Sequence, residues 1–81
     1  MRTIAELPHP KFKITIFSMN QKYIIKFEQS GLEQSYKINE MDILNGVDGV
    51  FELLDDDFYK QIESTFENMR TAFKEAYERY E

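Results

Sequence analysis

The sequence contains one histidine, His9, which is the only imidazole available to bind a metal ion or to transfer a proton near neutral pH. A metal site needs three or four ligands at a defined spacing, and a catalytic triad needs a base beside a nucleophile with a third group to orient the base. The residues around His9 supply neither. Because Pro8 and Pro10 flank it and require an extended backbone, we expect His9 on the surface of an extended N-terminal arm, residues 1–10. The alternative is a pH-sensitive contact at an interface.

The densest group of carboxylates is the run of three aspartates at 55–57, and clustered oxygen ligands are what a divalent cation prefers. Adjacent side chains at the start of a helix diverge, however, so these three do not converge on one ion. The stretch 42–48 also departs from the calcium-loop pattern, because its third and fifth positions are Leu44 and Gly46. We interpret the aspartates as the N-terminal cap of a helix, which requires no ion.

Cysteine is absent, which excludes disulfides, thiolate metal sites and cysteine nucleophiles together. The glycines at 31, 46 and 49 form neither a dinucleotide fingerprint nor a phosphate-binding loop. Paired carboxylates of the kind that glycosidases use have no specific support. We therefore expect no catalytic, metal-binding or cofactor-binding residues, and a protein that is not an enzyme.

The 81 residues carry 15 acidic against 10 basic side chains, a net charge of −5, and 42% of them are hydrophobic. This composition is typical of one small acidic domain with a thin core. The charge is unevenly distributed, because residues 1–39 carry a net +3 and residues 40–81 a net −8, as expected of two layers that attract each other. The first residues lack an apolar signal core, and no apolar run is long enough to span a bilayer. We therefore expect a cytoplasmic protein without a membrane segment.

Residues 11–39 alternate between apolar and polar side chains with the period of two that a half-buried strand requires. Polar breaks at 18–22 and 29–31 divide this segment into three strands. Connections this short permit only antiparallel hairpins, so we expect a three-stranded antiparallel meander in the order 1-2-3. Along its inward-facing side, Gln34 is the polar exception.

The turn at 20–21 gives the first hairpin a register that is chemically consistent on both faces. The second hairpin has two alternative registers. A turn at 30–31 suits the glycine but places Glu28 opposite Glu33, whereas a turn one residue earlier pairs Lys26 with Glu33. Both alternatives stay open. The register of the first hairpin places Ile16 opposite Ile25, Ile14 opposite Phe27 and Lys13 opposite Glu28.

The C-terminal third predicts a long amphipathic helix over 56–80, because at about 100° per residue its apolar side chains fall on one stripe. Residues 40–54 form an irregular connection in which we expect a short helix from about 49 to 54, capped by Asp48. Packing the long helix on one face of the meander gives a single α+β domain of two layers. The expected core consists of Phe12, Ile14, Ile16, Tyr23, Ile25, Phe27, Tyr36, Ile38, Phe58, Ile62, Phe66 and Met69.

A mismatch in length provides the main functional signal. The helix over 56–80 is about 37 Å long, whereas strands of six or seven residues span about 20 to 23 Å, so the helix should extend beyond its own sheet. Phe73, Ala76, Tyr77 and Tyr80 then lack an evident cover within the chain. Either residues 1–10 or 41–54 fold back over them, or they contact a second copy or another protein. Their four-and-three spacing also permits an antiparallel pair of helices.

The outward-facing side of the sheet offers a second candidate surface. Its basic and apolar side chains are Lys13, Phe17, Ile24, Lys26 and Lys37, a combination by which some sheets bind single-stranded nucleic acid or another anionic ligand. Two observations oppose this interpretation. Acidic side chains share the same face, and a net charge of −5 repels phosphate at long range. We therefore favour a non-enzymatic protein-interaction or homo-oligomerising module over a nucleic-acid-binding protein.

Four stretches between residues 7 and 42 resemble a group of short, uncharacterised bacterial proteins. The resemblance implies a bacterial, cytoplasmic setting and brings no activity, ligand, partner or functional residue with it. The stretches are Leu7-Pro8-His9-Pro10, Lys13-Ile14-Thr15, Asn20-Gln21-Lys22-Tyr23-Ile24 and Leu32-Glu33-Gln34-Ser35-Tyr36-Lys37.

Overall fold

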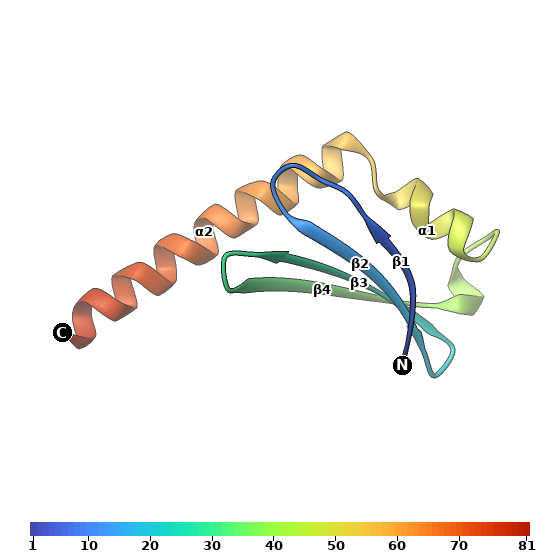
Figure 1. Cartoon of the computed structure of the whole chain (residues 1–81), viewed down its shortest axis with the longest axis horizontal. Coiled ribbons are helices and arrows are strands. Elements are labelled where there is room, and N and C mark those ends of the chain that lie inside the picture. Colours follow the sequence, from blue (N-terminus) through green and yellow to red (C-terminus); the bar gives the residue numbers. More distant parts are fainter.

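A computed structural model describes all residues, 1–81, and shows an α+β fold in two layers. One antiparallel sheet forms the first layer, and the helices lie together on one of its faces (Figure 1). The strands pair in the order β1-β2-β3-β4, so every strand neighbours the one that precedes it in the chain. The elements are β1 Arg2–Leu7, β2 Lys13–Met19, β3 Lys22–Gln29, β4 Leu32–Asn39, the 3₁₀-helix η1 Glu40–Asp42, α1 Val47–Leu53 and α2 Asp56–Tyr80.

The expectation of three strands is wrong, because most of the predicted arm is a fourth strand. Strand β1 pairs antiparallel with β2, and its register shifts between Thr3 and Ala5. This irregularity lets Ile4 and Leu7 both pack against the core although they are three positions apart. A regular strand would place them on opposite faces, so the strict alternation that marks the other strands is missing from β1.

Both hairpins turn through two residues whose backbone has positive φ. Asn20 and Gln21 have φ values of 51° and 64°, and the cross-strand register of the first hairpin is the expected one. In the second hairpin Ser30 and Gly31 make the turn, with φ values of 48° and 84°. Positive φ at both central residues matches the right-handed twist of the flanking strands, which explains why this turn prevails.

The second turn places Glu28 directly opposite Glu33, the like-charge pair that made the register ambiguous. Lys26 compensates for it, because its ammonium lies 3.8 Å from the Glu28 carboxylate and 3.6 Å from that of Glu33. One cation therefore serves both carboxylates across the pair of strands. The turn geometry determines the register, and the lysine offsets the repulsion that this register creates.

The core lies between the inner sheet face and the first half of α2. The predicted core is confirmed for its central members, while Tyr23, Phe58 and Met69 are half-buried against it. Ile38 is also half-buried. The prediction that Tyr36 belongs to the buried core is wrong. It lies on the edge strand β4, and 40% of it remains exposed. The buried members of the observed core, to which the prediction did not assign Val50, are Phe12, Ile14, Ile16, Ile25, Phe27, Val50, Ile62 and Phe66.

Gln34, the polar exception on the inner face, connects the sheet to the long helix. Its side-chain amide donates a hydrogen bond to the backbone carbonyl of Ile62, at 3.0 Å. Its own carbonyl oxygen accepts a hydrogen bond from the Tyr36 hydroxyl, at 2.7 Å. A buried amide is stable only when its polar atoms are satisfied, and here both are. Gln34 therefore fixes the position of α2 over β4.

The segment between sheet and long helix is more ordered than expected. Helix α1 begins at Val47, two residues before the expected start, and Gly46 rather than Asp48 is its N-cap. Gly49 lies inside α1, where an added Cβ would stand 2.1 Å from the carbonyl oxygen of Leu44. The prediction for α2 is confirmed at its start, since the Asp55 carboxylate accepts a hydrogen bond from the backbone N–H of Phe58 at 2.9 Å.

Candidate functional site

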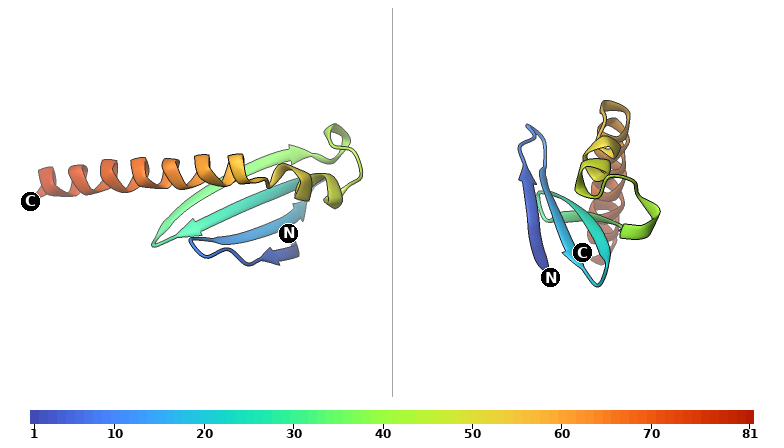
Figure 2. Two further views of the ribbon diagram at one scale, coloured as in Figure 1. Left: turned by 90° about the horizontal axis from the view of Figure 1, so that it is seen from above. Right: turned by 90° about the vertical axis from the view of Figure 1, so that its right-hand side faces the viewer.

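The C-terminal part of α2 extends well past the end of the sheet. Figure 1 shows this red end of the helix beyond the β3–β4 turn, and the left view of Figure 2 shows the same extension from above. We call residues 70–81 the helix overhang. Met69, just before it, is the last residue of α2 that packs against the core, and every residue of the overhang is exposed.

The overhang carries the aromatic stripe that the sequence analysis identified. Phe73 is 66% exposed, Tyr77 is 56% exposed and Tyr80 is 87% exposed, with Ala76 exposed between them. The rings of Tyr77 and Tyr80 lie 6.4 Å apart between centroids. The stripe continues, on the same side of the helix, the line of apolar residues that the sheet covers in the first half of α2.

Neither segment that could have covered this stripe does so. Ile4 and Leu7 belong to β1 and pack against the core. Residues 41–54 follow β4 and lie at the opposite end of α2, as Figure 1 shows. The chain therefore leaves Phe73, Tyr77 and Tyr80 uncovered.

The outer face of the sheet is less basic and less apolar than its residue types indicate. Lys13 lies 3.8 Å from Glu6 of β1, a neighbour that the three-strand prediction lacked. Lys26 is engaged with two glutamates, as described above. Ile24 is only 8% exposed, and Phe17, its cross-strand neighbour, is half-buried. Lys37, opposite Ile24, is the one lysine of this candidate set without a salt bridge.

His9 is not a surface residue of a free arm. Its ring stacks on Phe12 with a centroid distance of 4.0 Å and an interplanar angle of 4°, and the edge contact to Tyr59 is 4.9 Å. Its Nδ1 accepts a hydrogen bond from the backbone N–H of Lys11, at 3.1 Å. The half-buried imidazole therefore closes the end of the core between the β1–β2 connection and α2.

Two residues near His9, Lys11 and Tyr59, have shifted pKa values. The pKa of Lys11 is raised because its ammonium donates a hydrogen bond to Glu63 of α2 at 2.6 Å and is attracted by that carboxylate. Burial raises the pKa of the Tyr59 hydroxyl above 10.0, with a smaller contribution from the charge of Asp56. The folded chain therefore holds both protons more tightly than the unfolded chain does.

These shifts predict a loss of stability in alkaline solution. A raised pKa contributes stability that is fully present below the unfolded value and is lost as the pH rises through the folded value, here above about pH 10. The double variant Lys11→Met/Tyr59→Phe should lose less stability between neutral pH and that range than the unaltered protein. Urea denaturation at both pH values measures the difference. The variant Lys60→Met/Tyr80→Phe, altered at two exposed sites, should behave like the unaltered protein, and equal losses in all three would contradict the prediction.

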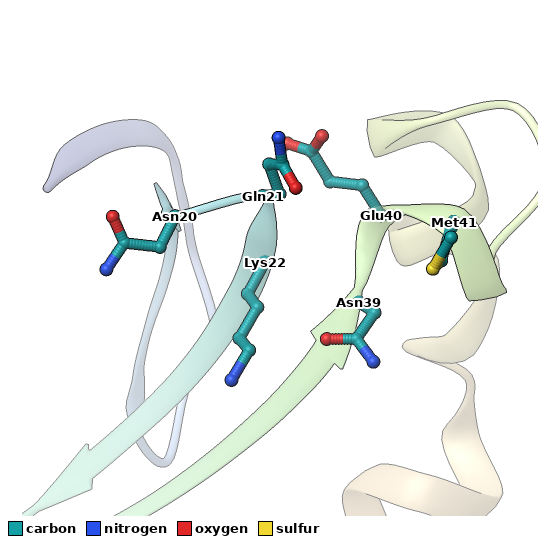
Figure 3. Close-up of a pocket in the computed structure, with 6 residues that line it drawn as sticks. All are labelled: Asn20, Gln21, Lys22, Asn39, Glu40 and Met41. Carbon is teal, nitrogen blue, oxygen red and sulfur yellow. The ribbon is translucent and has the colours of Figure 1, made fainter.

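The structure has two surface hollows that the sequence analysis did not anticipate. The larger, about 600 Å³, lies where the β2–β3 turn approaches the end of β4 (Figure 3), and its lining is polar apart from Met41. The smaller, about 280 Å³, lies between β4 and the helices and is apolar apart from Lys37. Each hollow is lined by residues from separate elements, so no local sequence pattern predicts it. The smaller hollow is lined by Ile25, Tyr36, Lys37, Ile38, Leu53 and Phe58.

Neither hollow brings together the groups that chemistry requires. In Figure 3 the Glu40 carboxylate points toward the side-chain amide of Gln21, while the side chains of Lys22 and Asn39, a cross-strand pair, run alongside each other. No nucleophile stands beside a base there. No group of three or more histidine and carboxylate side chains in the structure could hold a metal ion. None of the helices combines the length and apolar character needed to cross a membrane.

Comparison with known proteins identifies no relative of this chain. No protein-family model matches the chain, and searches of the curated proteins and of the solved structures find no match. Function is therefore inferred from this chain's own residues.

Proposed function

We propose that this chain is a non-enzymatic protein-interaction module that associates through the aromatic stripe of the helix overhang. The observation that carries the proposal is the exposure of Phe73, Tyr77 and Tyr80 on a part of α2 that no other segment of the chain covers. The two segments that could have covered these residues, 1–10 and 41–54, lie elsewhere in the structure.

Physical chemistry supports association at this surface. Burying an exposed aromatic side chain stabilises a complex by about 1.5–3 kcal/mol before the costs of association. Tyrosine and phenylalanine are enriched in interface cores, where a few such residues supply most of the binding energy. The overhang presents three of them on one face of a regular helix. Because all three lie on one regular helix, they are already aligned on one face before the stripe is covered.

Binding of single-stranded nucleic acid or another anionic ligand to the outer sheet face remains the alternative, with less support. Two of its three lysines, Lys13 and Lys26, already lie within 3.8 Å of carboxylates. A phosphate would have to compete with those carboxylates and with the net negative charge of the chain.

Site-specific photo-crosslinking tests whether the overhang associates with protein. A photoreactive phenylalanine analogue at Tyr77 should give crosslinked adducts on irradiation in the cells that naturally make the chain. The same analogue at Thr71, which is exposed on the opposite side of α2, is the matched control and should give few. Adding Phe73→Asp should abolish the adducts at Tyr77 because it places a charge in the stripe. Absent adducts, or equal yields at both positions, would overturn the proposal.

A further inference from the structure

We infer that this chain pairs with a second copy of itself through the free edge of β4, antiparallel and about a two-fold axis at Ser35. The sheets of the two copies then form one continuous sheet. This edge is separate from the helix overhang, so the pairing does not depend on the proposed function. It is supported by the unpaired backbone groups of β4, by the charges beside them and by the apolar hollow next to them.

Strand β4 presents backbone groups that have no partner. The left view of Figure 2 shows it as the outermost strand of the sheet on the side away from β1. Just after β4, the N–H of Glu40 donates to the carbonyl of Gln21 at 2.9 Å. Backbone direction alternates along an antiparallel strand, so Glu33, Ser35 and Lys37 direct their N–H and C=O groups away from β3. These three residues are exposed, and no other hydrogen bond uses their backbone groups.

The opposite edge of the sheet is protected from such pairing. Strand β1 has an irregular register between Thr3 and Ala5, and Pro8 and Pro10 follow it closely. Bulges and prolines are devices that keep an edge strand from pairing with another chain. Strand β4 pairs regularly with β3 over all its 8 residues and contains no proline. It therefore offers an uninterrupted row of donors and acceptors to a further strand.

A second copy of β4 completes this row by antiparallel pairing. With Ser35 opposite Ser35 of the second copy, Glu33 of each copy lies opposite Lys37 of the other. Each opposed pair exchanges two backbone hydrogen bonds, about six in all. A two-fold axis perpendicular to the sheet keeps inner face beside inner face. A parallel pair would instead place the apolar inner face of one copy beside the outer face of the other.

The charges select this register among those that the backbone permits. Moving one copy by two residues places Glu33 opposite Ser35 or Asn39 and separates it from Lys37. Moving one copy by four residues places two glutamates or two lysines directly opposite each other. The centred register alone therefore joins opposite charges, and it does so twice because of the symmetry.

Within one copy, the carboxylate of Glu33 has no cation of its own. It shares Lys26 with Glu28, at 3.6 Å and 3.8 Å respectively, and its side chain is 58% exposed. Lys37 takes part in no salt bridge. In the pair, Lys37 of the second copy lies on the free side of Glu33 and supplies the second cation. The pairing thus offsets the like-charge repulsion that the turn of the second hairpin creates.

Apolar contact adds to the pairing on the inner face. The hollow of about 280 Å³ lies beside β4, where Tyr36 and Ile38 form part of its lining. Leu53 of α1 also lines it and is 43% exposed. In the register centred on Ser35, Leu32 of the second copy lies opposite Ile38, on the face of the sheet that carries the hollow. Covering these side chains provides attraction, while the exposed ion pairs determine the register.

The contact is small, which sets the affinity to expect. The paired part of β4, residues 32–38, spans about 23 Å. Two such edges bury less than the roughly 800 Å² per partner of a standard stable interface. We therefore expect a dissociation constant in the micromolar range or weaker, so that the dimer forms at high concentration and dissociates on dilution.

Light scattering over a concentration series tests whether β4 pairs with a second copy. The mass should rise from 9.7 kDa toward twice that value as the protein is concentrated into the millimolar range. Ser35→Pro should stay monomeric because it removes an N–H at the axis, and should stay folded because that N–H faces solvent in the monomer. Phe73→Asp, which alters the overhang instead, should dimerise like the unaltered protein. A constant mass of 9.7 kDa, or a dimer that Phe73→Asp abolishes, would overturn the inference.

Charge exchange tests the register without altering the backbone. Glu33→Lys and Lys37→Glu each place like charges opposite each other, so each should raise the dissociation constant roughly tenfold. An equimolar mixture of the two variants should recover the original affinity, because every basic position then faces an acidic one. Glu6→Lys and Lys13→Glu make the same changes at the β1 edge of the outer face and should leave the affinity unchanged. A mixture no tighter than either variant alone would contradict the register.

Disulfide trapping tests the position of the axis, because the chain lacks cysteine and an introduced one is its only thiol. Opposed residues in a hydrogen-bonded pair have Cα atoms about 5.5 Å apart, within the range of a disulfide. Ser35→Cys should therefore form a covalent dimer on oxidation. The two copies of Glu33→Cys stand about 13 Å apart along the strands, so this control should crosslink far more slowly. Equal rates for the two variants would exclude an axis at Ser35.

Discussion

Replacing Phe66 by alanine should lower the free energy of unfolding by about 3–5 kcal/mol. Phe66 is completely buried in the middle of α2, and its ring centroid lies 6.0 Å from that of Phe12 on the sheet. Its removal leaves a cavity that the surrounding strands cannot fill without distortion. Because a domain of this size has about 5–15 kcal/mol of stability in total, the variant should be close to unfolding at 37 °C.

The same helix provides the matched control. Phe73→Ala removes the same atoms from a side chain that is 66% exposed, so it should cost less than about 1 kcal/mol in the monomer. Urea denaturation followed by circular dichroism, at a concentration low enough to exclude association, gives both values. Similar losses for the two variants would mean that the overhang is packed against the chain after all.

Deleting residues 1–7 should destabilise the protein by about 3 kcal/mol or more, although the sequence pattern assigns them to an arm. The deletion removes β1, with its hydrogen bonds to β2 and the packing of Ile4 and Leu7 on the core. It also leaves β2, which carries Ile14 and Ile16, as an unprotected edge. Exposed hydrophobic edge strands pair with other chains, so the shortened protein should aggregate as it unfolds.

Deletion at the other end should have a very different result. A chain that ends at Thr71 loses ten residues, all of them exposed, and should keep its stability within about 1 kcal/mol. Denaturation midpoints of both truncated proteins against the full chain measure the contrast. A shortened N-terminus that costs no more than the shortened C-terminus would contradict the role of β1.

Much of the fold follows from local patterns in the sequence. The meander over 11–39 and the helix over 56–80 have clear periods of two and 3.6, and the structure places both elements where those periods predict them. The registers follow from turn chemistry, since both two-residue turns require positive φ and the glycine at 31 favours one of the two alternatives. These features depend on neighbours in the chain, which is why the sequence alone reveals them.

The errors arise where an interaction depends on residues that are distant in the sequence or on an irregular backbone. The irregularity between Thr3 and Ala5 hides the strand period of β1. His9 is half-buried against Tyr59, fifty residues further along the chain. Tyr36 is more exposed than its alternation predicts, because β4 is an edge strand and has no neighbour on one side.

The candidate surfaces show the same division. The overhang could be predicted, because it depends only on the length of a helix against the length of a strand. The neutralisation of the outer sheet face could not be predicted in full, because Glu6 reaches Lys13 only through the pairing of β1 with β2. Basic residues that share one face of a strand form a positively charged surface in the folded protein only if no neighbouring strand places carboxylates beside them.

The overhang also changes how the molecule moves through solution. The structure measures 48 × 26 × 20 Å, and its Cα radius of gyration is 14.6 Å, whereas a compact chain of this length has a radius of about 12 Å. An elongated particle experiences more friction than a sphere of equal mass and elutes earlier from a gel-filtration column. A monomer of this protein would therefore run at the position of a larger globular standard. Elution volume alone would therefore overstate the mass of the monomer. The number of copies can be derived from a hydrodynamic measurement only after a correction for the elongated shape, whose axial ratio is roughly two from these dimensions.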